Sequence, residues 1–210
     1  MCYNLETSRR AFLFGVLSGL CLMKFGNAKH SDINKTLGIF FIFVSFMQYV
    51  EYLIWSDLKC VNGNNALAGT IGPLLNYLQP TMLFVLAMIY IKKRNLSNDD
   101  IFPIILNVGY LIYVVFMYLE YMKGNKCTKI KNGHLKWSWR NMRMYIFYNL
   151  IAILNIVYYL NDNVSIFAFS LSYVYFFISM FNFNKHLGEI WCFLVTNIPL
   201  MVLIYEKIIG

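Results

Sequence analysis

Apolar segments long enough to cross a lipid bilayer recur along the whole chain, and short polar stretches separate them. A spanning helix needs about 20 mostly apolar residues, and only helices or closed barrels satisfy the backbone within lipid. No alternating strand pattern competes with these segments. The sequence therefore predicts an all-α, polytopic membrane helix bundle that forms a single transmembrane domain over residues 1–210. We expect seven transmembrane helices, at residues 11–24, 37–55, 66–91, 101–121, 144–160, 164–181 and 187–205.

The composition supports a membrane protein over a soluble one. Hydrophobic residues make up 59% of the chain and charged residues 13%, whereas soluble domains are about half apolar and a quarter charged. The net charge of +8 resides mostly in the loops, where it favours membrane lipids as partners over nucleic acid. The five cysteines include no CxxC pair and no zinc-ligand spacing, so we predict neither a metal nor a cofactor.

Two features qualify the assignment of the spans. The first apolar run, residues 11–23, follows two arginines as the hydrophobic region of a signal peptide would. Because Lys24 comes next and no A-x-A cleavage site is present, we favour a short first span, and six spans result if this run does not cross. Inside the third and seventh helices, Pro73, Pro80 and Pro199 predict kinks.

The charges of the loops predict an orientation. With seven spans, eleven Lys and Arg residues lie on the N-terminal side and seven on the other, so we expect a cytoplasmic N-terminus and a C-terminus on the opposite side. The N-x-S/T sequons at Asn34, Asn95 and Asn163 all fall on the C-terminal side. Cys60 and Cys127 share the N-terminal side, so a disulfide between them is conceivable, although a cytoplasmic location would keep both reduced.

The largest loop, residues 122–142, is basic and contains Trp137 and Trp139. We expect a solvated loop that rests on anionic headgroups, with both tryptophans as interfacial anchors. The alternative is a lid over a cavity within the membrane.

Polar side chains gather at one depth, in the half of the predicted bundle nearest the N-terminal side. Gln48, Glu51 and Trp55 share a helix face, and an ionisable group within a span is costly enough to be a functional candidate. This asymmetry predicts a polar cavity open to the N-terminal side, although buried amides also serve as interhelical hydrogen-bonding groups. The candidate ligand-binding residues are Gln48, Glu51, Trp55, Asn76, Gln79, Asn149, Glu189 and Trp191.

The leading functional hypothesis is transport or binding of a small polar or cationic solute. Glu51 would anchor its charge, and Trp55 or Trp191 would present a ring face to a cation. One alternative is an intramembrane enzyme on a lipid-like substrate, with Glu51 as general acid or base beside His186 or Glu189. The other is a structural membrane protein of a virus or organelle. A homo-oligomeric channel with a ring of Glu51 carboxylates is a further option.

Three short motifs carry a resemblance to known sequences: Q-Y-V-E-Y-L-I-W (Gln48–Trp55), L-Q-P (Leu78–Pro80) and G-E-I-W-C-F followed by a proline (Gly188–Pro199). They resemble those of an uncharacterised family of small multi-spanning (about seven-helix) membrane proteins of large DNA viruses and microbes, which carry Q-x-x-E-x-x-x-W and G-x-x-W-C motifs. The resemblance implies that these positions form one structural unit, and it supplies no substrate.

Overall fold

The computed structural model describes residues 4–93, 97–131, 134–139, 142–183 and 187–209, without the side chains of residues 131, 142–143, 182–183 and 187–189. The all-α prediction is confirmed, since helices make up most of this structure. They are α1 (Leu5–Phe25), α2 (Ser31–Ser56), α3 (Asn64–Tyr77), α4 (Gln79–Tyr90), α5 (Ile101–Tyr121), α6 (Met142–Tyr159), α7 (Asn163–Phe183), α8 (Leu187–Leu194) and α9 (Ile198–Ile209). Short 3-10 turns are η1 (Ala28–His30), η2 (Asn98–Asp100) and η4 (Val195–Asn197).

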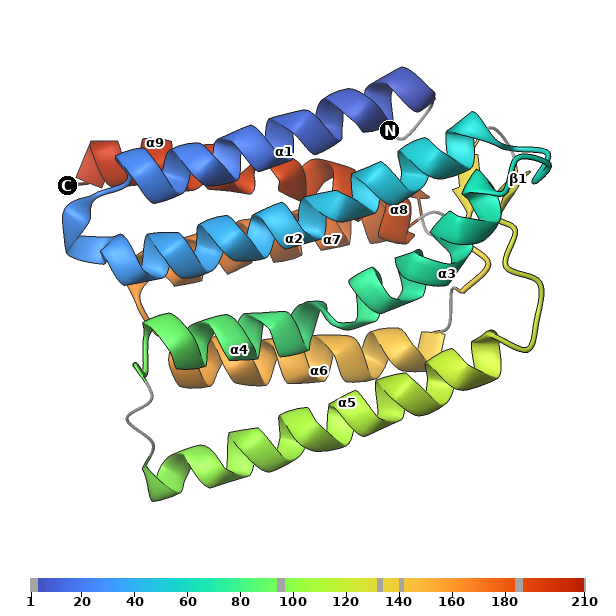
Figure 1. Ribbon diagram of the computed structural model, residues 1–210. Coiled ribbons are helices and arrows are strands. Elements are labelled where there is room, and N and C mark those ends of the chain that lie inside the picture. The colour runs from blue at the N-terminus through green and yellow to red at the C-terminus, as the bar shows by residue number, and fades with distance from the viewer. Residues whose placement is uncertain (1–3, 94–96, 132–133, 140–141, 184–186, 210) are drawn as a thin grey trace.

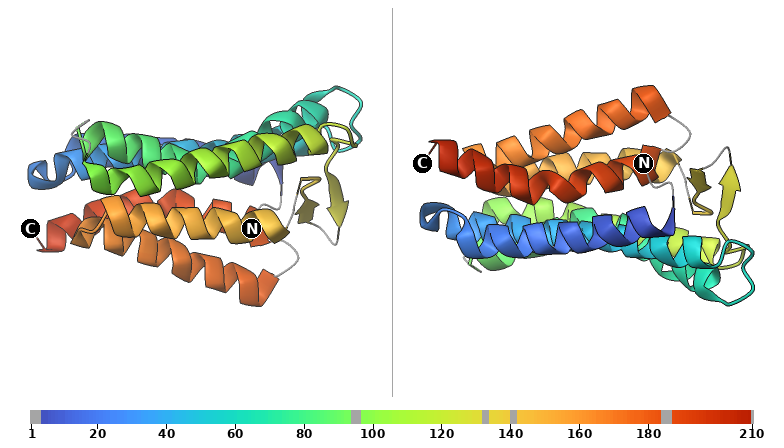
Figure 2. Two further views of the ribbon diagram at one scale, coloured as in Figure 1. Left: turned by 90° about the horizontal axis from the view of Figure 1, so that it is seen from below. Right: turned by 90° about the horizontal axis from the view of Figure 1, so that it is seen from above.

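The helices run back and forth between two ends of the molecule (Figure 1). One end carries an antiparallel hairpin of β1 (Lys129–Lys131) and β2 (His134–Lys136), and we call it the hairpin end and the opposite one the far end. The helices α1 to α5 form one layer and α6 to α9 the other (Figure 2). The C-terminus lies at the far end, while α1 begins toward the hairpin end (Figure 1).

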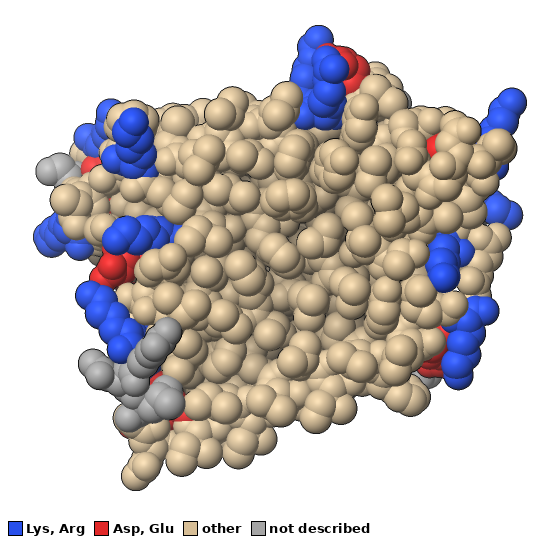
Figure 3. All heavy atoms as spheres, in the orientation of Figure 1, with Lys and Arg blue, Asp and Glu red and all other residues tan. Residues whose placement is uncertain are grey.

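Several of these helices are suited to a membrane. Four segments are long and apolar enough to cross a bilayer, and the bent pair of α3 and α4 makes a fifth if it counts as one span. The four are Ala28–Ser56, Asn98–Tyr121, Asn163–Phe181 and Ile190–Ile209. On the face that Figure 3 shows, charged side chains gather mainly at the two ends and leave a broad uncharged area between them. The described residues therefore support an integral membrane protein with four to five spans, and this criterion does not confirm a count of seven.

The first helix packs closely into the bundle. A Cβ on Gly15 would lie 2.1 Å from the Oγ atom of Ser45, and one on Gly19 would lie 2.9 Å from the carbonyl oxygen of Gly38. Small residues four positions apart allow this close approach between membrane helices. The Ser18 hydroxyl also donates to the backbone oxygen of Thr196, at 3.1 Å. Hence α1 contacts both layers as an integral part of the bundle.

The loop between α5 and α6 folds into a cap over the hairpin end. We call its described residues from Met122 to Trp139 the hairpin cap. Leu135, Trp137 and Trp139 are 1%, 2% and 3% exposed and join the apolar core of that end. The expectation that Trp137 and Trp139 anchor a solvated loop at the lipid interface is therefore wrong, because protein covers both rings.

Asp57 organises the turn between α2 and α3. One oxygen of its carboxylate accepts the N–H groups of Val61 (2.8 Å) and Asn62 (3.1 Å), and the other accepts that of Asn65 (3.3 Å). Burial alone would raise the pKa of Asp57, but these backbone donors outweigh burial and hold it below the model-compound value of 3.8. The carboxylate therefore stays ionised at neutral pH and caps the N-terminus of α3.

Candidate ligand-binding site

The break between α3 and α4 is the centre of the polar contacts inside the bundle. The two helices are bent by 51° relative to each other, and Pro80 in the first turn of α4 lacks a backbone N–H. The carbonyl oxygen of Tyr77 accepts a bond from the Tyr110 hydroxyl (2.8 Å), and that of Pro80 accepts one from Asn155 Nδ2 (3.0 Å). The kink predicted in the third helix is thus confirmed, and side chains of α5 and α6 hydrogen-bond to backbone carbonyls on either side of the break.

Pro73 and Pro199 differ in what they do to their helices. Pro73 lies within α3 and does not end it. Near Pro199, the 3-10 turn η4 lies between α8 and α9 within the single span Ile190–Ile209, and the kink predicted in the seventh helix stays a prediction.

Four of the candidate residues are buried inside the bundle. Gln48, Glu51 and Gln79 are 0% exposed and Asn76 is 2% exposed. The Tyr148 hydroxyl of α6 donates to the side-chain oxygen of Gln79. Gln48 and Glu51 also have interactions within the protein, so neither needs a ligand as its partner. Their burial matches the expectation of an interior polar group, whereas their role in binding stays a prediction.

The other candidate residues lie in different surroundings. Trp55 is partly buried and packs against the core of the hairpin end. Asn149 donates to the backbone oxygen of Tyr145 (2.7 Å), one turn earlier on α6. The indole N–H of Trp191 donates to the backbone oxygen of Ser172 on α7, at 3.0 Å. The side chain of Glu189 lies outside the described residues.

A narrow internal cavity lies where the two layers meet. Its free space is small, about 30 Å³, and among the candidate residues whose side chains the structure describes it brings together Asn149 and Trp191 alone. The walls come from α2, α4, α6, α7, α8 and η4, and the lining is almost entirely apolar. Its lining residues are Phe40, Phe41, Val44, Pro80, Leu83, Tyr148, Asn149, Ala152, Ile156, Phe169, Ser172, Tyr173, Phe176, Trp191 and Val195.

An open groove runs along the outside of the bundle between α6 and α7. The space within it is about 390 Å³, and it is lined by Ile153, Ile156, Val157, Ile166, Phe169, Ser170, Tyr173, Val174 and Phe177. Three of these side chains, from Ile156, Phe169 and Tyr173, also line the internal cavity. The groove and the cavity therefore share a wall, and the groove faces the region that lipid would occupy.

Reasoning from sequence did not select the residues that form this wall. Aromatic and aliphatic side chains in residues 144–181 are usual as bulk that faces lipid or the core, and they carry no periodic polar signal. Among the residues that the structure describes, no group of three His, Cys, Asp or Glu side chains is placed to hold a metal ion.

No protein-family model, curated protein or solved structure matches this chain. The resemblance to small multi-spanning proteins of viruses and microbes stays a prediction.

Proposed function

We propose that this protein is an integral membrane protein that binds the acyl chain of a membrane lipid between α6 and α7. The observation that carries the proposal is the open apolar groove between α6 and α7, where Ile156, Phe169 and Tyr173 also border the internal cavity. A groove that opens sideways to the bilayer admits lipid without passage through water. A narrow apolar space fits a hydrocarbon chain better than it fits a compact polar solute.

We also propose that the chain crosses the bilayer seven times, with α3 and α4 forming one span and α8 and α9 another. The two further spans, in addition to the five candidates above, are α1 with 21 residues and α6 with 18 residues. At 1.5 Å per residue these lengths come to roughly 32 and 27 Å, close to the hydrocarbon thickness of about 30 Å. The close packing of Gly15 and Gly19 on α2 holds α1 inside the same bundle.

The polar atoms at the cavity favour an apolar ligand. The Tyr148 hydroxyl donates to Gln79, and the Trp191 indole donates to Ser172. The amide nitrogen of Asn149 donates to Tyr145 within its own helix. Since these donors already bond within the protein, a polar solute would have to displace their bonds, whereas an acyl chain would not.

A photoactivatable phosphatidylcholine with a diazirine on its acyl chain tests this function in reconstituted bilayers. We expect adducts in the segment from Ile166 to Phe177 of α7. Ser170→Trp, which fills the groove with a large side chain, should reduce these adducts several-fold. Ile112→Phe on the exposed face of α5 (65% exposed) is the matched control and should leave them unchanged. Equal labelling of α7 and of the α5 face in all three proteins would reject the proposal.

Binding or transport of a small polar or cationic solute is the second candidate. Within the described part of the chain, the side-chain nitrogens of Asn76 and Gln79 are buried without a hydrogen-bond partner. Such donors could bind a polar solute near the helix break, with Glu51 as the charged group. A flux assay with amine solutes in proteoliposomes tests this second function. Equal rates for the wild type and Glu51→Gln would exclude Glu51 as the group that binds the charge of the solute.

A further inference from the structure

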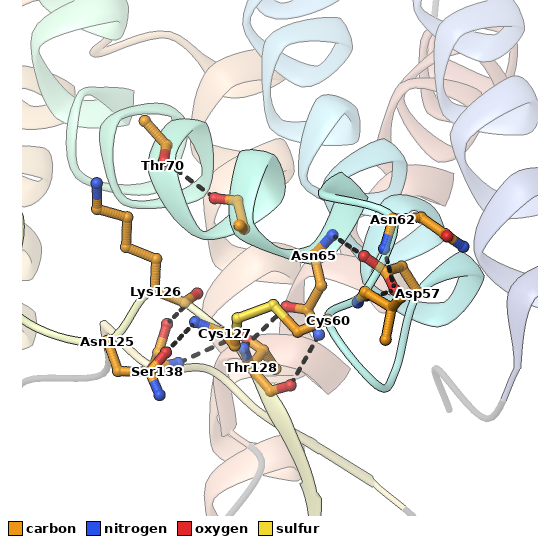
Figure 4. Close-up of a disulfide and its surroundings, with 12 residues drawn as sticks. Asp57, Cys60, Asn62, Asn65, Thr70, Asn125, Lys126, Cys127, Thr128 and Ser138 are labelled. Atoms are coloured by element: carbon orange, nitrogen blue, oxygen red, sulfur yellow. Dashed lines mark hydrogen bonds between the residues drawn. A yellow bond between two sulfur atoms is a disulfide. The ribbon is translucent and has the colours of Figure 1, made fainter.

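The hairpin end contains a disulfide between two segments far apart in the sequence. Cys60 lies in the turn after α2 and Cys127 lies in the hairpin cap, 67 residues later, with Cα atoms 6.2 Å apart. Figure 4 shows the bond beside the contact between Asn65 and Thr128. The two remaining cysteines that the structure describes, Cys21 and Cys192, lie on α1 and α8 and form no disulfide.

Polar contacts independent of sulfur hold the same two segments together. The side chain of Asn65 bonds both backbone groups of Thr128, accepting its N–H at 2.8 Å and donating to its carbonyl at 3.0 Å. Close by, a Cβ on Gly69 would lie 1.9 Å from the backbone oxygen of Lys126, so the cap rests directly on α3. The fold itself therefore places the two sulfur atoms within bonding reach.

We propose that the hairpin end faces an oxidising compartment, such as the cell exterior, the periplasm or the lumen of the secretory pathway. Disulfides persist in those compartments and are rare in the reducing cytosol. With seven passes, the N-terminus then lies in the oxidising compartment and the C-terminus in the cytoplasm. This orientation is opposite to the one expected from the loop charges, and it goes beyond the proposed lipid binding.

The oxidation needs a defined electron acceptor. The Cys60 and Cys127 thiols lose two protons and two electrons as the sulfur–sulfur bond forms. A disulfide-donating thiol oxidoreductase of that compartment takes them up, and its own disulfide becomes two thiols through a mixed-disulfide intermediate. The proposal thus also assigns Cys60 and Cys127 as the substrate site of such a partner.

In the folded protein, the Asn34 sequon and the loop charges give little support to the reverse orientation. The side chain of Asn34, the first of the three sequons, is 1% exposed and donates to Glu206 at 3.0 and 3.1 Å. The folded protein therefore leaves no room for a glycan on the Asn34 side chain. The excess of eleven over seven cationic residues comes from residues 122–143, which contain seven of the eleven. Most of these residues belong to one folded, disulfide-bonded cap, and the rest of that side holds four cationic residues against seven on the other side.

The oxidation state is tested on the full-length chain in its membrane. After denaturation, a polyethylene glycol maleimide should add two more labels to the wild type once it is reduced. The Cys60→Ser/Cys127→Ser variant should gain none. If the wild type reacts fully before reduction, the thiols are free and the proposal is overturned.

The orientation is tested with one exposed cysteine at a time added to that double-serine variant, whose own labelling at Cys2, Cys21 and Cys192 is subtracted as background. Lys129→Cys reports the hairpin end and Lys29→Cys the far end, and both lysines are exposed. In sealed microsomes, whose outer face is cytoplasmic, a membrane-impermeant maleimide should label Lys29→Cys at once and Lys129→Cys only after detergent opens the vesicles. The reverse pattern would overturn the proposal.

A folding control accompanies the labelling test. Each variant should keep the elution volume and melting temperature of the double-serine variant in detergent. If the Lys129→Cys protein fails this control, Lys59→Cys in the exposed turn beside Cys60 replaces it as the reporter of the hairpin end.

Discussion

The carboxamides of Asn107 on α5 and Asn155 on α6 bond to each other in both directions. Asn107 Nδ2 lies 2.8 Å from Asn155 Oδ1, and Asn155 Nδ2 lies 3.1 Å from Asn107 Oδ1. Because Asn155 Nδ2 also donates to the Pro80 carbonyl, one side chain of α6 joins α5 to the start of α4. This pair holds together helices whose remaining contacts are mostly apolar.

We expect Asn155→Ala to destabilise the protein by about 1–2 kcal/mol, more than Asn107→Ala does, because it removes bonds to two helices. Unfolding in mixed micelles with increasing sodium dodecyl sulfate measures the difference. Asn161→Ala in the exposed turn before α7 is the control. Equal stability of Asn155→Ala and this control would contradict the role of Asn155 in joining α6 to α4 and α5.

The contact between α1 and α2 predicts that Gly19→Val is poorly tolerated. A Cβ alone would already lie 2.6 Å from Ile42 and 2.9 Å from the backbone of Gly38, so the helices must separate. We expect a cost of about 1–3 kcal/mol, visible as a lower melting temperature in detergent. Leu17→Val, whose side chain is 61% exposed on the same helix, should melt as the wild type does. Similar melting of the two variants would show that α1 does not pack as described.

The hydrogen bonds of Asp57 predict a pH-dependent contribution to stability. Its pKa in the folded protein lies below 3.8, so the contribution is complete above about 3.8 and is lost as the pH falls through the folded pKa. Asp57→Asn should therefore lower the melting temperature at pH 7, and the gap to the wild type should narrow below about pH 3.8. Melting curves across this pH range provide the measurement. Asp99→Asn on the exposed far end controls for net charge, and a gap that is constant with pH would refute the role of Asp57.

At the far end, Asn34 and Glu206 predict a charge-specific effect. Glu206 is 5% exposed and accepts bonds from Asn34 Nδ2 and from the backbone N–H of Asn27 (2.9 Å). Asn34→Asp would set two carboxylates against each other, and we expect a loss of about 2 kcal/mol or more. Adding Glu206→Gln should restore part of that stability in a double-mutant cycle. A purely additive double mutant would mean that the two side chains do not interact.

The sequence predicted the helices well because apolar length and proline position are local properties. The expected segment 101–121 coincides with α5, and the proline-containing third helix breaks where Pro80 follows Gln79. The hairpin escaped notice because each strand has three residues, too few for an alternating pattern to stand out.

The candidate site was only partly accessible from the sequence. A buried carboxylate such as Glu51 is conspicuous in an apolar run, and its interior position is observed. The wall formed by Phe169 and Tyr173 is different, because aromatic residues cover every face of α7 and only tertiary packing decides which of them border the cavity. The sequence therefore indicated the polar interior and missed the apolar groove.

The bond from Cys60 to Cys127 closes a covalent ring that contains α3, α4 and α5. Any backbone cut within this ring leaves both ends tethered through sulfur. A protease that nicks the far-end connection between α4 and α5 would therefore release no fragment under non-reducing conditions. The two pieces would separate only after treatment with a thiol, so a nicked molecule would pass for an intact one on an ordinary non-reducing gel.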